Sequence, residues 1–176
     1  MEEQRKDEAP FVGMRVKEET LSKIVLEWWE EQSVHPPVPL ISLLKRIFIF
    51  SPARTASTKR EWDINAPAET ITVDLDSQHA TRIKQLRYEN SEHTDLNLRE
   101  VSRVRIQMEE LGHHFRLYLE SPNQEPFQVS IAFINSSYSP DALIAHGRKI
   151  GKALNRPVVQ QHTDLGHLIA EETLQV

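Results

Sequence analysis

The spacing of hydrophobic positions changes along the chain, and near the N-terminus it predicts a helix. Residues 18–32 interleave glutamates with apolar side chains that recur every three or four positions, at Leu21, Ile24, Val25, Trp28 and Trp29. This spacing places the apolar side chains on one face of an amphipathic helix. The three prolines between His35 and Leu40 end the pattern, because proline lacks an amide donor and disfavours helix in the residue before it.

From residue 61 onward apolar and polar positions alternate, which is the period of a strand with one buried face. The alternation predicts strands at 71–75, 101–109, 115–119 and 127–133, with another in 83–88. A first strand around Trp62 and Ile64 is expected to pair with 71–75 as a hairpin, and 101–109 is expected to pair with 115–119.

A helix is predicted over residues 139–154. Ser139 is placed to cap its N-terminus, Pro140 suits the first helical position, and Asp141 favours the positive end of the helix dipole. Its apolar stripe contains Leu143, Gly147, Ile150 and Leu154. After the helix, the sequence predicts a short edge strand at 158–159 and a final short helix within 163–173.

Strands followed by a helix predict an α+β fold. We expect an antiparallel β-sheet or partly open barrel, followed by a packing C-terminal helix, with an N-terminal helical arm. The expected divisions are an acidic arm with one helix (1–33), a basic, proline-containing apolar segment and linker (34–60), an α+β core domain (61–157), and a C-terminal tail with a short helix (158–176).

The succession of short antiparallel strands from Glu61 to Ile134, closed by one amphipathic helix from Ser139 to Leu154, resembles the pleckstrin-homology-like barrels. In that family a C-terminal helix plugs one open end of a seven-stranded barrel, whereas five or six strands are predicted here. The resemblance implies a module that binds lipid headgroups, peptides or partner proteins rather than an enzyme.

Charge is distributed unevenly. The net charge is -5, yet residues 34–60 contain five Lys and Arg and no acidic residue. The same segment contains the most apolar run of the chain, 40–50, predicted as a short amphipathic helix, with a strand at 47–50 as the alternative. Lys45 and Arg46 interrupt this run, and it is shorter than the roughly 20 apolar residues that cross a bilayer.

This basic, apolar segment is the main functional candidate. Its composition is typical of an element that docks on an anionic membrane surface or on a larger protein complex. The candidate residues are Leu44, Lys45, Arg46, Ile47, Phe48, Arg54, Lys59 and Arg60. The alternative is that the apolar residues pack on the sheet and acidic regions neutralise the cations. Trp28 and Trp29 pose the same choice between facing a partner and packing inside.

The sequence offers no catalytic motif, and we expect no enzyme activity, metal or cofactor. The chain has no cysteine, which excludes thiolate metal sites and disulfides. A rival hypothesis is a small enzyme or ligand carrier that uses His113, His114 and nearby carboxylates in a cleft. The N-terminus has no apolar run after its charged start, so we expect a cytoplasmic protein, peripheral to a membrane if the candidate segment docks there.

An RNA-binding module is a further alternative. It would use the basic residues of the predicted strands, which are Arg82, Lys84, Arg87, Arg99, Arg103 and Arg105. Aromatic side chains for base stacking are scarce among them, and glutamates dilute their charge. Cross-strand salt pairs explain these residues better. We therefore predict a non-enzymatic binding or assembly protein whose partner is a protein or an anionic membrane, with nucleic acid disfavoured and the oligomeric state open.

Overall fold

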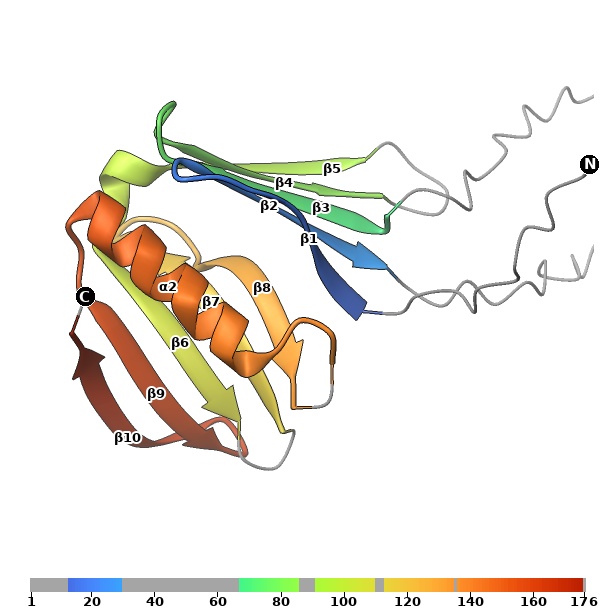
Figure 1. The fold of residues 1–176 in the computed structure, drawn as a ribbon. Helices are drawn as coiled ribbons and strands as arrows, with labels where there is room; N and C mark the ends of the chain where they lie inside the picture. Colours follow the sequence, from blue (N-terminus) through green and yellow to red (C-terminus); the bar gives the residue numbers. More distant parts are fainter. Residues whose placement is uncertain (1–12, 30–66, 86–90, 110–112, 135, 176) are drawn as a thin grey trace, which may run out of the picture.

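The computed structural model describes residues 13–29, 67–85, 91–109, 113–134 and 136–175 (Figure 1). These residues form ten strands in two five-stranded sheets, with one α-helix and one short 3-10 helix. The protein is therefore mostly β, and the predicted α+β fold with an N-terminal helical arm is wrong. No helix in these ranges is long and apolar enough to cross a membrane.

The N-terminal sheet is an antiparallel meander of five neighbouring strands. In chain order these are β1 (Gly13–Glu19), β2 (Lys23–Trp29), β3 (Glu69–Asp74), β4 (His79–Lys84) and β5 (Glu92–Asn97). A 3-10 helix, Leu98–Glu100, follows and leads the chain into the second sheet.

The C-terminal sheet has the order β10-β9-β6-β7-β8. Its elements are β6 (Arg103–Glu109), β7 (His114–Glu120), β8 (Phe127–Phe133), α2 (Pro140–Leu154), β9 (Val158–Asp164) and β10 (His167–Leu174). Helix α2 carries the chain from β8 across the sheet to β9. Strand β9 consequently runs parallel to β6, while the other neighbours are antiparallel.

The expected N-terminal helix is strand β2, for a reason visible in its burial. Ile24 and Leu26 lie on the core face, and Val25 and Glu27 on the opposite face are buried as well. A strand buried on both faces has apolar residues at adjacent positions, which imitates the spacing of an amphipathic helix. Leu21, counted in the helical pattern, is 95% exposed in the turn between β1 and β2.

The predictions for the middle of the chain are mostly confirmed. Strands β3, β6, β7 and β8 lie where the alternation placed them, and Ser139 caps α2 by accepting a hydrogen bond from the Ala142 amide over 3.2 Å. The expected strand at 83–88 overlaps the end of β4 only at residues 83–84, its last three residues lie outside the described ranges, and β5 was not predicted. Strands β4 and β5 each bury one apolar side chain, Ala80 or Leu96, so neither has an alternating pattern. The expected strand around Trp62 lies outside the described residues.

The last residues form the hairpin β9–β10 instead of a tail with a short helix. Leu165 and Gly166 between the strands both have positive φ, 49° and 79°. Two successive residues in this region make a turn whose twist matches that of a hairpin. Strand β10 is exposed along most of its length. It therefore lacks the alternation of apolar and polar residues that would have indicated a strand.

Helix α2 lies over one face of the C-terminal sheet, and the N-terminal sheet packs beside it, with β8 in contact with β1 and β3 (Figure 1). A continuous cluster of buried apolar side chains joins both sheets and the helix. Gly147 allows the close approach of α2: a Cβ there would lie 3.0 Å from Ile106 Cδ1 and 3.2 Å from Leu117 Cδ1. The helix therefore rests directly on β6 and β7.

Candidate docking surface

Residues 34–60 are attached to one end of the N-terminal sheet. Strand β2 ends at Trp29, and the chain re-enters the described part at residue 67, where the Ala68 amide donates to the Trp28 carbonyl over 2.9 Å. Trp28 then pairs with Glu69 in the β2–β3 register. The two attachment points of the basic segment are therefore neighbours. The eight candidate residues from Leu44 to Arg60 lie outside the described residues.

A cluster of charged and aromatic side chains covers β1 and β2 near this end. The Glu27 carboxylate, which is only 2% exposed, lies 2.8 Å from Arg15 Nη2 and 2.7 Å from Lys17 Nζ. Trp29 Nε1 donates to the same carboxylate over 3.3 Å, and the Arg15 guanidinium stacks on the Trp29 ring at 4.4 Å from its centroid. Trp29 is thus held between a cation and an anion.

The electrostatics of this cluster favour an ionised Glu27. Burial raises the pKa of the Glu27 carboxyl, but hydrogen bonds and attraction from Lys17 and Arg15 together bring it below its ordinary value. Two cations on one carboxylate leave the cluster with a net charge of about +1 at neutral pH. This end of the sheet therefore carries a cationic excess beside an aromatic ring.

A shallow apolar cleft of about 200 Å³ opens between the N-terminal sheet and β8. Its lining residues are Met14, Trp28, Glu69, Ile71, Gln128, Val129, Ile131 and Phe133. The rings of Trp28 and Phe133 approach to 6.4 Å between centroids. Phe133 is 39% exposed and the following Ile134 is 53% exposed. Aromatic and aliphatic side chains thus extend from Trp28 to the end of β8.

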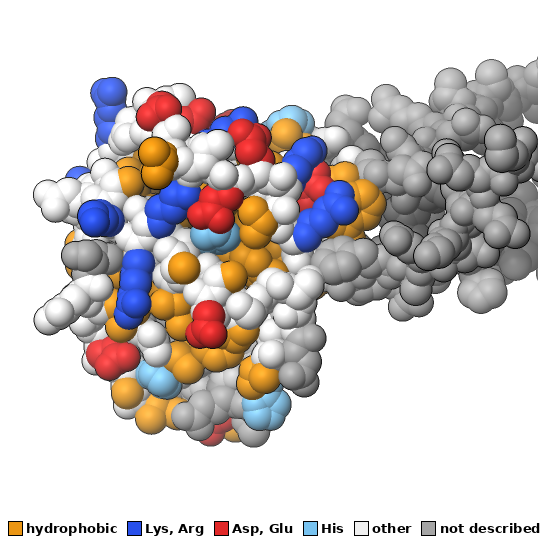
Figure 2. All heavy atoms as spheres, in the orientation of Figure 1, with side chains coloured by type: hydrophobic (Ala, Val, Ile, Leu, Met, Phe, Trp, Pro, Cys, Tyr) orange, Lys and Arg blue, Asp and Glu red, His pale blue; other side chains and the backbone are white. Residues whose placement is uncertain are grey.

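We call this region, formed by Arg15, Lys17, Trp28, Trp29, Phe133 and Ile134, the aromatic-basic end. Trp28 and Trp29 are both half-buried. As successive residues of β2 they point to opposite faces of the sheet, Trp28 toward Phe133 and Trp29 toward Arg15. The sequence singled out these two residues, but it could not show that Arg15 and Phe133 join them from other strands. Elsewhere on the face seen in Figure 2, cations and anions are interspersed without a large patch of one sign.

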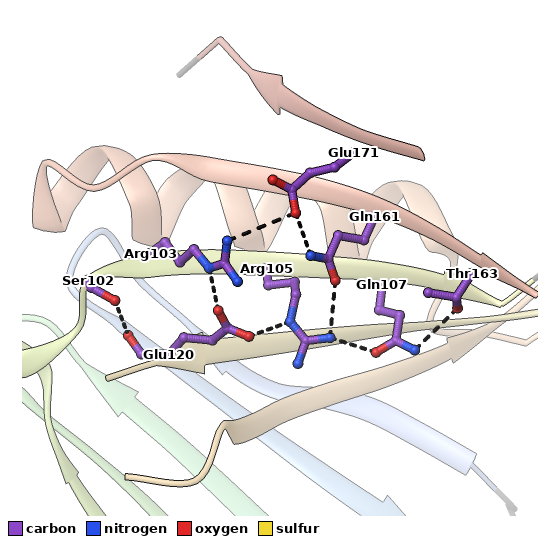
Figure 3. A network of polar contacts seen from close by, with 8 residues as sticks. All are labelled: Ser102, Arg103, Arg105, Gln107, Glu120, Gln161, Thr163 and Glu171. Atoms are coloured by element: carbon purple, nitrogen blue, oxygen red, sulfur yellow. Dashed lines mark hydrogen bonds and ion pairs between the residues drawn. The ribbon is translucent and has the colours of Figure 1, made fainter. Parts of the chain in front are cut away.

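Three of the six basic residues considered for RNA binding are paired within the sheets. On the face of the C-terminal sheet that α2 leaves open, Arg103 and Arg105 both bind the Glu120 carboxylate, with Arg105 Nε 2.5 Å from Oε1 (Figure 3). Arg82 is likewise paired with Glu69 across β3 and β4. These arginines form the cross-strand salt pairs that the sequence favoured.

The Glu120 pairs belong to a longer polar network (Figure 3). Arg105 Nη1 donates to Gln107 over 2.7 Å, and Gln107 Nε2 donates to Thr163 over 3.3 Å. Burial raises the pKa of Glu120, but the hydrogen bonds and attraction from Arg103 and Arg105 lower it by more. The pKa of Glu120 therefore lies below its ordinary value. The network links β6, β7 and β9 side by side, which makes it a structural feature of the sheet.

The histidines proposed for a cleft do not converge. His113 lies in a turn with φ of 47°, while His114 begins β7 with its ring 6.1 Å from that of Phe133. Within the described ranges no group of three His, Asp or Glu side chains could hold a metal ion. Two buried polar atoms there, His114 Nε2 and Asp164 Oδ1, have no hydrogen-bond partner, but strand alternation places them on opposite faces of the sheet.

A chain of polar groups, buried except for the exposed Glu19, crosses the contact between α2 and both sheets. Tyr138 Oη lies 3.2 Å from Ser130 Oγ and 2.8 Å from His146 Nδ1, and His146 Nε2 lies 3.3 Å from a Glu19 carboxylate oxygen. The sequence prediction missed this chain, because its members come from four parts of the sequence. One signal was present: His146 falls three residues after Leu143 on the apolar stripe of the helix.

Comparison with known proteins finds no relative of this chain. The resemblance to pleckstrin-homology-like barrels was carried by element order, and eight strands precede α2 in the described part of the chain. That resemblance stays a prediction. No protein-family model, no curated protein and no solved structure matches this chain.

Proposed function

We propose that the protein is a non-enzymatic binding protein that docks on an anionic membrane surface through residues 34–60 and the adjoining aromatic-basic end. The observation that supports this proposal is the position of the two attachment points. The chain that carries the basic segment leaves the N-terminal sheet at Trp29 and returns beside Trp28, at the end where half-buried aromatic and exposed cationic side chains flank the sheet on its two faces.

The chemistry of the combined surface suits an anionic bilayer. Tryptophan is enriched at the membrane interface, because its ring is apolar and its indole N–H is polar. Each Lys or Arg near an anionic surface contributes about 1 kcal/mol, and residues 34–60 hold five cations and no acid. Arg15 and Lys17 add a local excess of positive charge after Glu27 is paired.

A protein partner is the competing occupant of the same surface. The charge of residues 34–60 favours the membrane, because it is of one sign along the whole segment. A groove on a protein would instead demand matched charges at defined positions, whereas a bilayer needs only an excess of cations and apolar side chains that can enter it.

The test is co-sedimentation of the full chain with vesicles of phosphatidylcholine alone or of phosphatidylcholine with phosphatidylserine. We expect the wild type to pellet only with the phosphatidylserine vesicles. The double variant Lys45→Glu/Arg46→Glu should stay in the supernatant, since it replaces two cations of the segment by anions.

The matched control is Arg148→Glu/Lys152→Glu, which makes the same change in formal charge on exposed positions of α2. It should pellet like the wild type, and circular dichroism should show that both double variants are folded. Wild-type protein that stays in the supernatant with both kinds of vesicle, or a control that loses binding as fully as the segment variant, would overturn the proposal.

A further inference from the structure

His146 of helix α2 connects the helix to both sheets through polar contacts. The imidazole is only 4% exposed, as is expected for a residue on the inner side of the helix. Its Nε2 faces Glu19 at the end of β1, and its Nδ1 faces Tyr138, which in turn contacts Ser130 on β8. Lys149, one turn along α2, donates to the other Glu19 oxygen over 2.9 Å.

The contacts of His146 with Glu19 and Tyr138 can form with the ring in either protonation state, and the number of hydrogen bonds stays the same. When His146 is neutral, Nε2–H donates to Glu19, Nδ1 accepts from the Tyr138 hydroxyl, and the Ser130 hydroxyl donates to the Tyr138 oxygen. When His146 is protonated, Nδ1–H donates to the Tyr138 oxygen, and Tyr138 donates to Ser130 instead. The two hydroxyls reorient, so both states keep the same number of hydrogen bonds, although in the protonated state the Ser130 hydroxyl accepts from Tyr138 instead of donating to it.

The ionisable groups around His146 come from three elements. Strand β1 supplies Glu19, α2 supplies Lys149, and the connection before α2 supplies Tyr138, whose pKa burial raises well above its ordinary value, so that it stays a neutral phenol. Ser130 of β8 cannot ionise. Apolar side chains of β6 and β7 face the helix: Val104, Ile106, Leu117 and Leu119.

Strand β9 also has ionisable side chains on the helix side of the sheet, His162 and Asp164. Among the described residues neither of them forms an ion pair with His146, whose one ion-pair partner there is Glu19. Glu19 therefore faces the ring directly, and Lys149 contacts the same carboxylate.

We propose that His146 makes the attachment of the β1–β2 turn to α2 sensitive to pH. Protonation of the ring converts the Nε2 hydrogen bond to Glu19 into an ion pair, which holds the turn more firmly against the helix. Histidine is the side chain that ordinarily changes charge between pH 5 and 8. The strands that meet at this turn carry Trp28 and Trp29 at their opposite end, yet the proposal holds whether or not that end binds a membrane.

The experiment compares the unfolding of the full-length wild type and Glu19→Gln at pH 5 and pH 8. Glu19 is ionised at both, because the hydrogen bond from Lys149 and the interactions with His146 bring its pKa below the ordinary value of 4.5 despite burial. The Lys149 contact therefore contributes equally at the two pH values. We expect the substitution to change the unfolding equilibrium constant about threefold more at pH 5 than at pH 8.

Two controls make the result specific to His146. Glu69→Gln breaks the pair with Arg82, which involves no histidine, and its effect should be the same at both pH values. The His146 ring signals in the NMR spectrum report protonation directly, and in Glu19→Gln the ring should lose its proton at lower pH than in the wild type. An effect of Glu19→Gln that is equal at pH 5 and 8, or an unchanged ring titration, would refute the proposal.

Discussion

The ring of Trp28 on β2 lies 6.4 Å from that of Phe133 on β8, inclined by 42°. The two residues belong to different sheets and are both partly exposed. Their contact therefore joins the two sheets at the aromatic-basic end, and both rings line the cleft together with Ile71 and Ile131.

This contact predicts a measurable coupling between the two rings. Trp28→Ala and Phe133→Ala should each lower the free energy of unfolding by about 1–2 kcal/mol, less than for fully buried aromatic residues. The double variant should lose less than the sum, with an interaction energy of about 0.5–1.5 kcal/mol. Urea denaturation of the four proteins measures it, and strictly additive losses would show that the rings stabilise the protein independently.

Gly147 predicts an unusual response to alanine. In an open helix Gly→Ala stabilises by about 1 kcal/mol, but here the new Cβ would meet Ile106 Cδ1 at 3.0 Å. Ile106 and Leu117 are fully buried, so neither can move aside freely, and overpacking of this kind costs about 1–3 kcal/mol. We expect Gly147→Ala to lower the melting temperature.

The same substitution has an internal control. Ile106→Val removes the Cδ1 atom with which the new methyl group collides. In the Ile106→Val background, Gly147→Ala should therefore be clearly less damaging than in the wild type. An equal loss in both backgrounds would place the cause elsewhere than in this contact.

Glu120 predicts a loss of stability in acid. Its folded pKa lies below the ordinary 4.5, since Arg103 and Arg105 outweigh burial. The stabilisation is therefore complete above pH 4.5 and is lost as the pH falls through the lower folded value. Glu120→Gln should cost about 2 kcal/mol at pH 7, because two partly buried arginines lose their anion.

Thermal unfolding between pH 2 and 7 measures this dependence. The difference between wild type and Glu120→Gln should be constant above pH 5 and shrink as the pH falls below 4.5. A difference that stays constant down to pH 2 would contradict the role assigned to the arginine pairs.

Vesicle binding is expected to depend on salt. If the cations of residues 34–60 and Arg15 attract the bilayer, raising NaCl from about 0.05 to about 0.5 M shortens the screening length and should release most of the bound protein. The pelleted fraction measures the effect. Binding that persists at high salt would assign the affinity to apolar insertion by the tryptophans instead.

Part of this fold could be predicted because local signals agreed with the tertiary structure. Phe127, Val129 and Ile131 alternate with polar residues, and Ser139 and Pro140 mark a helix start, so β8 and α2 were placed within one residue of their bounds. Strand β2 was mistaken because both of its faces are buried, and the apolar residues Val25 and Trp29 on the second face interrupt the alternation.

The candidate site could be predicted only in outline. The charge of residues 34–60 and the pair Trp28-Trp29 stand out in the sequence, but the side chains that complete the surface come from distant strands. Arg15 reaches Glu27 through the β1–β2 register, and Phe133 reaches Trp28 through the packing of the two sheets. Tertiary contacts of this kind leave no periodic mark in the sequence.

The hydrogen bond from Ala68 to Trp28 means that β2 and β3 are already adjacent where residues 30–66 depart. The pairing of β2 with β3 should therefore depend only weakly on the number of residues between them, because the entropy of closing a loop grows slowly with loop length. A two-residue Asn-Gly turn in place of 30–66 should leave the strands paired. The stretch of chain that we propose as the docking segment can then be exchanged by design, while the two sheets beside it stay the same.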